Sequence, residues 1–191
     1  MAALPPAVTI DNPVDGQALN NPVVDISGTS DPSVAVDVYI DDTRTGSVTA
    51  DSTGKWAYTT GSLAEGTHRV YANATDSMGN TGVSNTVNFE IDVTPPVVTI
   101  TNPTEGSYTN STKIEGQTEP GLAVTVYVYG QEATVTADGT GYWVYWNDTL
   151  PEGGHSVYAS AVDKAGNNGV SETRSFILDM TRPVISPDIF P

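Results

Sequence analysis

Carboxylate side chains are the groups in this sequence best suited to chemistry. The 191 residues hold 23 Asp and Glu against 7 Lys and Arg, which gives a net charge of −16. Carboxylate oxygens are the ligands that Ca²⁺ takes in proteins, so this composition is compatible with a divalent cation. It argues against nucleic acid, whose phosphates need a Lys and Arg surface, and against an anionic membrane. No stretch approaches about eighteen apolar residues, so we expect no direct membrane insertion.

The two histidines are the other titratable groups of interest, and their setting argues against catalysis. His68 and His155 each follow a turn glycine by two residues, and neither has a nearby Ser or Cys motif for nucleophilic attack. We expect each ring to close a turn by hydrogen bonding to the backbone, as the corner residue of a β-sandwich does. Phosphate-binding glycine loops and metalloprotease motifs are missing as well. We therefore expect no enzyme activity.

The elements that position these residues come from an internal duplication. An offset of 87 residues takes Trp56 to Trp143 and Tyr71 to Tyr158, and near the start of each copy the offset is 90. We therefore expect repeat 1 over residues 1–92 and repeat 2 over residues 93–180. Pro95-Pro96 forms the short linker between them, because each proline fixes φ and removes a backbone donor. Residues 181–191 are expected to start a following linker or to be a truncated tail of a longer protein.

Each repeat is predicted to be an all-β domain. The predicted strands of repeat 1 are residues 7–10, 23–28, 34–40, 46–50, 55–59, 68–75 and 85–91. Alternation is clearest where Val34, Val36, Val38 and Ile40 face one way. Seven antiparallel strands in about 88 residues predict an immunoglobulin-like β-sandwich. The fold class is therefore two tandem seven-stranded sandwiches, joined end to end.

The aromatic residues of the fifth predicted strand are expected to supply bulky core contacts. They are Trp56 with Tyr58 in repeat 1 and Trp143 with Tyr145 in repeat 2. Trp146 breaks the inward alternation, and we expect it at the surface.

The repeated motifs resemble the bacterial immunoglobulin-like tandem repeats of large cell-surface adhesins and biofilm-associated proteins. The resemblance covers residues 5–184 and is carried by “DISGTSDPSVAVDVYID”, “VTADSTGKWAYT”, “LAEGTHRVYANATDSMGN”, “NFEIDVTPP” and their counterparts in repeat 2. It implies an exported protein with such domains in long arrays. It also implies calcium that stiffens the connections between repeats.

The acids are predicted to converge where repeat 1 passes into repeat 2. Strands of a sandwich alternate in direction, so its turns lie at two opposite poles. We predict a junction Ca²⁺ with ligands from both sides and half-sites at the outer ends, because calcium takes about six to eight oxygens. The predicted junction ligands are Asp92, Thr94, Glu119, Asp163 and either Glu65 or Asp15; the half-sites are Asp31 with Asp76, and Asp179 with Thr181. The alternative is that these acids only cap their own turns.

The leading functional prediction is a stalk of extender modules on a bacterial cell surface, outside the cell. Its partners are neighbouring repeats of the same chain, and we expect a monomer. A second hypothesis is a module that binds carbohydrate or a host protein through exposed aromatic residues. The candidate residues are Tyr71, Tyr127, Tyr129, Trp146 and Tyr158. A third hypothesis is an accessory domain of a secreted enzyme.

Overall fold

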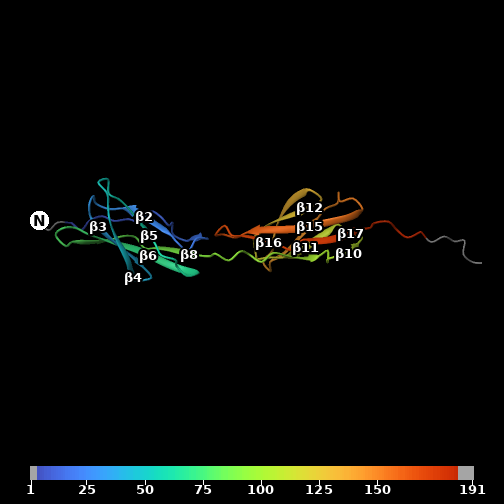
Figure 1. The fold of residues 1–191 in the computed structure, drawn as a ribbon, viewed down its shortest axis with the longest axis horizontal. Coiled ribbons are helices and arrows are strands. Elements are labelled where there is room, and N and C mark those ends of the chain that lie inside the picture. Colours follow the sequence, from blue (N-terminus) through green and yellow to red (C-terminus); the bar gives the residue numbers. More distant parts are fainter. Residues whose placement is uncertain (1–3, 185–191) are drawn as a thin grey trace, which may run out of the picture. The chain divides into compact units, whose positions relative to one another are not determined.

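The computed structural model describes residues 4–184, which fold into β-strands joined by turns (Figure 1). The chain divides into two compact units, Met1–Thr94 with Lys164–Gly166, and Pro95–Asp163 with Asn167–Pro191. Within the described residues, no helix has the length and apolar character that a membrane span requires. Of the predicted tail 181–191, residues 185–191 lie outside the described part.

Unit 1, which holds repeat 1, forms two sheets that pack face to face. The larger has the order β1-β8-β6-β3-β4, with β7 paired to β6, and the smaller pairs β2 with β5. β1 runs parallel to β8, and the other paired strands are antiparallel. The strands are β1 Gln17–Leu19, β2 Asp25–Thr29, β3 Ala35–Ile40, β4 Thr43–Thr49, β5 Lys55–Thr59, β6 Gly66–Thr75, β7 Thr81–Val83 and β8 Val87–Ile91.

Unit 2, which holds repeat 2, repeats this arrangement. Its larger sheet has the order β10-β17-β15-β12-β13, with β16 paired to β15, and its smaller sheet has the order β14-β11-β9. The strands are β9 Thr99–Asn102, β10 Ser107–Thr109, β11 Lys113–Gln117, β12 Ala123–Val128, β13 Gln131–Thr136, β14 Tyr142–Trp146, β15 Gly153–Val162, β16 Asn168–Val170 and β17 Arg174–Leu178.

Each unit has its own hydrophobic core between its two sheets. In unit 1 the inward alternation predicted for β3 is confirmed, since Val36 and Val38 are fully buried and Ile40 is 4% exposed. Trp56 packs in this core at 3% exposure, and Trp143 takes the same place in unit 2 at 1%. Trp146 is 55% exposed, as predicted. Period-two burial of β-branched and aromatic side chains therefore accounts for both sandwiches.

The number of strands differs from the seven predicted for each repeat. Among the described residues there are eight strands in unit 1 and nine in unit 2. The additional strands are three residues long: β1 and β10 pair with the last strand of the unit, and β7 and β16 pair with the sixth predicted strand. Residues 7–10 of unit 1 do not form a strand, although Val8 bridges Ser30 and the Thr9 amide donates to the Thr29 carbonyl at 2.8 Å, whereas β9 of unit 2 is a strand.

In each unit, the first residues of the sandwich pass close to the backbone of a glycine. This glycine lies in β7 in unit 1 and in β16 in unit 2. A Cβ added to Gly82 would lie 1.9 Å from the Pro6 carbonyl oxygen, and one added to Gly169 would lie 1.9 Å from that of Pro96. Both prolines are buried. The second proline of each Pro-Pro pair therefore starts the inward alternation, and only glycine leaves room for its carbonyl.

This crossing predicts a stability difference between two Gly→Ala variants of repeat 1. Gly82→Ala should lower the free energy of unfolding by about 1–3 kcal/mol, because the methyl group overlaps backbone that cannot move freely. Gly61→Ala is the matched control, since its Cβ would meet nothing within 4 Å. Chemical denaturation measures both variants. Equal stability of the two would contradict the assignment of Gly82 to a close backbone crossing.

Candidate functional site

The segment that leaves β8 is held by a carboxylate clamp. Glu65 Oε1 accepts hydrogen bonds from the Thr94 hydroxyl at 2.7 Å and from the Val93 amide at 2.9 Å. Asp92 Oδ1 accepts one from the Thr94 amide at 3.1 Å. The Asp92 amide donates to the Leu19 carbonyl at 2.9 Å, which extends the parallel β1–β8 pairing. Three of the predicted metal ligands, Glu65, Asp92 and Thr94, are thus brought together inside unit 1.

The clamp depends on an ionised carboxylate. The Thr94 hydroxyl and then the Val93 amide lower the pKa of Glu65 below its ordinary value. A group whose pKa is lowered by folding contributes stability above its unfolded-state pKa. That contribution is lost as the pH falls through the folded-state value. The clamp's contribution to stability is therefore present at neutral pH and is lost in acid.

Unit 2 carries the same clamp at the end of β17. Glu152 Oε1 accepts hydrogen bonds from the Thr181 hydroxyl and the Met180 amide, both at 3.0 Å. Asp179 Oδ1 accepts one from the Thr181 amide, also at 3.0 Å. Asp179 and Thr181, predicted as a metal half-site, therefore belong to a hydrogen-bonded turn. Glu152 was not predicted, although the 87-residue offset from Glu65 leads directly to it.

Asp76 and Asp163 each cap the turn in which they stand. Asp76 Oδ1 accepts from the amides of Met78 and Asn80, and its Oδ2 accepts from the Asn80 side chain at 2.7 Å. Asp163 accepts from the Asn167 amide at 2.9 Å and from its side chain at 2.8 Å. The Asn80 side chain, followed by its amide, lowers the pKa of Asp76. Turn capping, the alternative to metal binding, accounts for these bonds.

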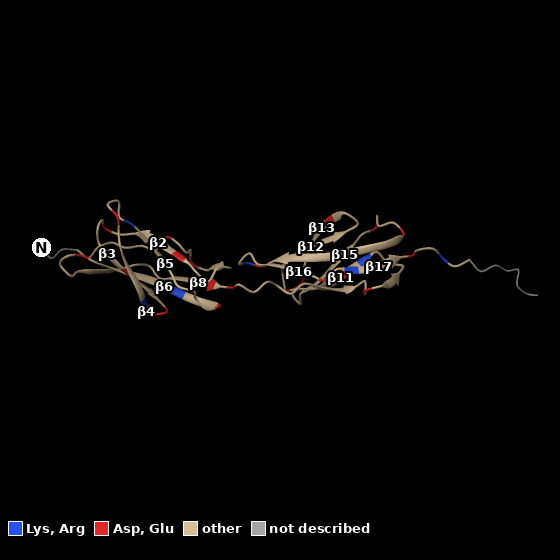
Figure 2. Ribbon diagram, viewed as in Figure 1, with Lys and Arg blue, Asp and Glu red and all other residues tan. Residues whose placement is uncertain are grey.

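The other predicted ligands lie in turns of their own. Glu119 and Asp31 are exposed in the turns that follow β11 and β2, and Asp15 Oδ1 accepts from the Asn88 amide at 2.8 Å. Asp and Glu residues outnumber Lys and Arg residues along the chain (Figure 2). Even so, residues 4–184 contain no group of three or more His, Cys, Asp or Glu placed to hold a metal ion.

The histidines close turns, as predicted. His68 Nε2 donates to the Ala64 carbonyl at 2.9 Å, and His155 Nε2 donates to the Pro151 carbonyl at 2.7 Å. His68 also pairs through Nδ1 with the Asp41 carboxylate at 2.7 Å. Burial lowers the pKa of His68, but the Ala64 carbonyl and Asp41 together outweigh it and raise that pKa above its ordinary value. Both rings therefore serve the fold.

The outer face of each larger sheet carries a pair of stacked tyrosines. Tyr39 on β3 and Tyr71 on β6 have ring centroids 4.9 Å apart, and Tyr127 on β12 and Tyr158 on β15 have them 4.6 Å apart. In both pairs the two residues are directly opposite each other in the strand register. Tyr39 was missed in the sequence, because finding it requires the cross-strand register.

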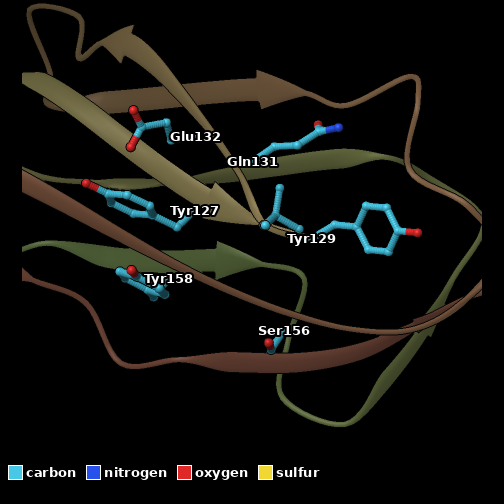
Figure 3. A pocket seen from close by; sticks show the side chains of 8 residues that line it. Tyr127, Tyr129, Gln131, Glu132, Ser156 and Tyr158 are labelled. Atoms are coloured by element: carbon cyan, nitrogen blue, oxygen red, sulfur yellow. The ribbon is translucent and has the colours of Figure 1, made fainter.

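In unit 2 the tyrosine pair borders a pocket of about 500 Å³. Figure 3 shows Tyr127 between Glu132 and Tyr158, with Tyr129 at the end of the β12–β13 hairpin. Trp146 is not part of this surface, because it lies on β14 in the other sheet. The aromatic surface predicted from the sequence is therefore corrected: Tyr71 is half-buried in unit 1, and Trp146 stands separately.

The carboxylate clamp, the turn closed by a histidine and the stacked tyrosine pair occur at equivalent positions in both units. Each unit can therefore be compared with known domains by itself. The family model described as “Bacterial Ig-like domain” matches residues 16–93 and again residues 99–180. The chain belongs to the bacterial Ig-like domain family. Both sandwiches are therefore members of one domain class, in agreement with the resemblance found in the sequence.

Individual proteins that are similar to this chain share only low sequence identity with it. The chain is 29% identical to Bacillopeptidase F of Bacillus subtilis (strain 168) over 182 residues, which is 93% of this chain but only 12% of that protein. The fibronectin(III)-like modules of Clostridium thermocellum CbhA match with a TM-score of 0.56 and 23% identity, over 90% of this chain and 93% of theirs. That likeness establishes the fold alone. A tetra-tandem repeat from the extending region of a large adhesion protein matches with a TM-score of 0.45 and 22% identity, over 92% of this chain and 50% of that one.

The clamp predicts how Glu65 titrates. Its carboxyl should titrate below the ordinary value for Glu, since the Thr94 hydroxyl and the Val93 amide both stabilise the ionised form. Side-chain NMR against pH measures the midpoint, and the Val93 amide shift should follow the same curve. In Thr94→Val the midpoint should rise toward the ordinary value. A wild-type midpoint at or above the ordinary value would refute the clamp.

Proposed function

We propose that the two repeats are structural extender modules of a bacterial cell-surface adhesin or biofilm protein. In this proposal they lie outside the cell, act as a monomeric chain and contact neighbouring repeats of the same chain. They set reach and stiffness and carry no catalytic residue. Membership of the bacterial Ig-like family and the tandem arrangement support this role. We further propose that the repeats are bounded at residues 92 and 180.

The path of the chain through each repeat is the observation that carries the proposal. One end of the ten-residue strand β6 pairs with β7, against which Pro6 lies, and the other end pairs with Ile91 at the end of β8. The same holds for β15 with β16 and Leu178. At about 3.3 Å per residue, the chain therefore advances roughly 30 Å between its arrival and its departure. Domains connected in this way add length when they are joined in series.

The clamp supports stiffness as well as length. Glu65 and Asp92 fix Val93 and Thr94, just after β8, at the point where a flexible connection would otherwise begin. Pro95 and Pro96 then fix φ at the next two positions. Few backbone torsions are left free between the last strand of repeat 1 and the first residues of repeat 2.

Calcium at the repeat junction is the second part of the proposal. We propose Asp92, Glu65 and Thr94 of repeat 1, with Glu119 and Asp163 of repeat 2, as the oxygen donors. The clustering of the first three within unit 1 and the chain's excess of acids support this proposal. A cation would offset the repulsion between crowded carboxylates, and calcium accepts the irregular geometry of such a set.

An accessory module of a secreted enzyme is the alternative with a specific observation in its favour. The chain is similar to a stretch of Bacillopeptidase F that is 12% of that protein's length. In such a setting the two domains would still act as spacers. The two proposals differ in the protein to which the spacers belong, which is a cell-surface adhesin or biofilm protein in the first and a secreted enzyme in the second.

Adding repeats tests the extender role. Chains with two, three and four copies of residues 5–94 in series should show a maximum dimension in small-angle scattering that grows by about 30–40 Å per copy, since each sandwich and its linker advance the chain by that amount. Replacing the Pro5-Pro6 pair that follows Thr94 by two glycines at each junction gives the control, which should shorten the mean dimension. Growth of less than about 15 Å per copy would contradict the role.

Removing calcium tests the metal. At a calcium concentration 100 times the dissociation constant, binding should stabilise the chain by about 2.7 kcal/mol relative to EDTA. Thermal melting measures this shift. Asp92→Asn should abolish most of it, whereas Asp11→Asn, which removes one exposed acid elsewhere in repeat 1, should not. Identical melting in millimolar calcium and in EDTA would refute the calcium proposal and leave the extender role standing.

A further inference from the structure

The stacked tyrosines of the two repeats have different neighbours. In repeat 1, Arg44 on β4 lies directly opposite Tyr39, and Arg69 stands on the same face of β6, two residues before Tyr71. Arg44 pairs with Asp37 at 2.7 Å, and Arg69 pairs with Asp42. Repeat 1 therefore places two arginines of its own beside its tyrosine pair, and each arginine has its own carboxylate.

Repeat 2 has lost both arginines from this face. The residue opposite Tyr127 is Glu132, and the residue two positions before Tyr158 is Ser156. The positions of the two pairing acids are taken by Thr125 and Gly130. Within the described residues, Glu132 makes no ion pair, and Tyr158 is 39% exposed. The result is an open aromatic surface with a carboxylate and no cation of its own (Figure 3).

Tyr129 adds a third ring at a position that disfavours it. The β12–β13 hairpin turns on Tyr129 and Gly130, whose φ angles are 53° and 69°. Such a two-residue turn favours Asn, Asp or Gly at its first position, and repeat 1 has Asp41 there. The Tyr129 ring stands edge-on to His155, with centroids 5.5 Å apart, and the residue is 59% exposed. Turn geometry therefore does not explain a tyrosine at this position, whereas a role for its exposed ring does.

We propose that this surface of repeat 2 binds the guanidinium group of an arginine in a basic partner peptide. Aromatic ring faces attract cations, and a planar guanidinium stacks on them while it donates hydrogen bonds to a carboxylate. Tyr127, Tyr129 and Tyr158 supply the rings, and Glu132 supplies the acceptor. In repeat 1, arginines of the same chain stand at the positions equivalent to Glu132 and Ser156. This indicates that a guanidinium group suits the face that carries the tyrosine pair. The net charge of −16 attracts a basic partner from a distance. This site does not depend on the extender role or on calcium.

Binding of short peptides to the full chain tests the proposal. The probe is a fluorescent peptide with two arginines separated by glycines, and the same peptide with glutamine for arginine is its control. The arginine peptide should bind, and the amide shifts that move in NMR should map to β12, β13 and β15. The glutamine peptide should not bind. A panel of neutral oligosaccharides tests the competing ligand class.

Four variants separate this site from the general attraction of an acidic protein. Tyr129→Asn and Glu132→Gln should each weaken arginine-peptide binding about fivefold, the effect of one lost cation–π or charge contact. Ser156→Arg, which restores the arginine of repeat 1, should block the surface to a similar extent. Glu90→Gln, on β8 of repeat 1, changes the net charge as Glu132→Gln does and should alter binding less than about twofold.

Tyr129→Asn also separates binding from folding, since asparagine suits the positive φ and the melting temperature should not fall. The proposal is overturned by an equal loss in Glu90→Gln, by full binding in Tyr129→Asn, by binding of the glutamine peptide, or by binding of oligosaccharide in place of the arginine peptide.

Discussion

Each sandwich depends on one long strand, β6 in repeat 1 and β15 in repeat 2. Residues 70–75 of β6 pair with β3, residues 73–75 pair with β7, and residues 66–70, at the other end, pair with β8. Val70, Ala72 and Ala74 from its inner face are fully buried in the core. The same strand holds the corner histidine and one stacked tyrosine. The pairing and burial of this one strand therefore fix three things: the position of the core, the distance between the two ends of the sandwich, and the position of the outer tyrosine face.

The acids have a local role whether or not a metal binds. Asp51 and Asp138 cap equivalent turns, and each has its pKa lowered first by the hydroxyl of the threonine two residues later. Glu65 and Glu152 clamp equivalent segments after the last strand. Because folding lowers the pKa of Asp51, Asp138 and Glu65, the stability that their ionised forms contribute is lost as the pH falls through those lowered values. A calcium ion would add to turns that are already ordered.

The sequence was sufficient for the fold class and for most of the core, because alternation and the duplication are strong signals. Val36 and Val38 could be placed inward from their spacing alone. The three-residue strands β1 and β7 could not be predicted, because they are shorter than one full cycle of a clear pattern and β7 contains glycine. The clamp was predicted only as a group of acids, since its hydrogen bonds depend on how the turn before β6 meets the end of β8. The tyrosine pairs required cross-strand register, which a single strand does not reveal.

The two repeats share a scaffold but present different surfaces, which is the expected outcome when a duplicated domain keeps its core and varies its outer face. For the proposed spacer role, the important feature is that the chain arrives at one end of β6 and departs at the other. The chain has no cysteine, so two introduced cysteines can be labelled without competition. Spin labels at Ala7 and Val93 measure the separation of these two points within repeat 1 by electron paramagnetic resonance. The account predicts a narrow distribution centred near 30 Å, the length of the ten-residue strand. A distribution centred below about 15 Å, with the two ends on the same side of the sandwich, would contradict it.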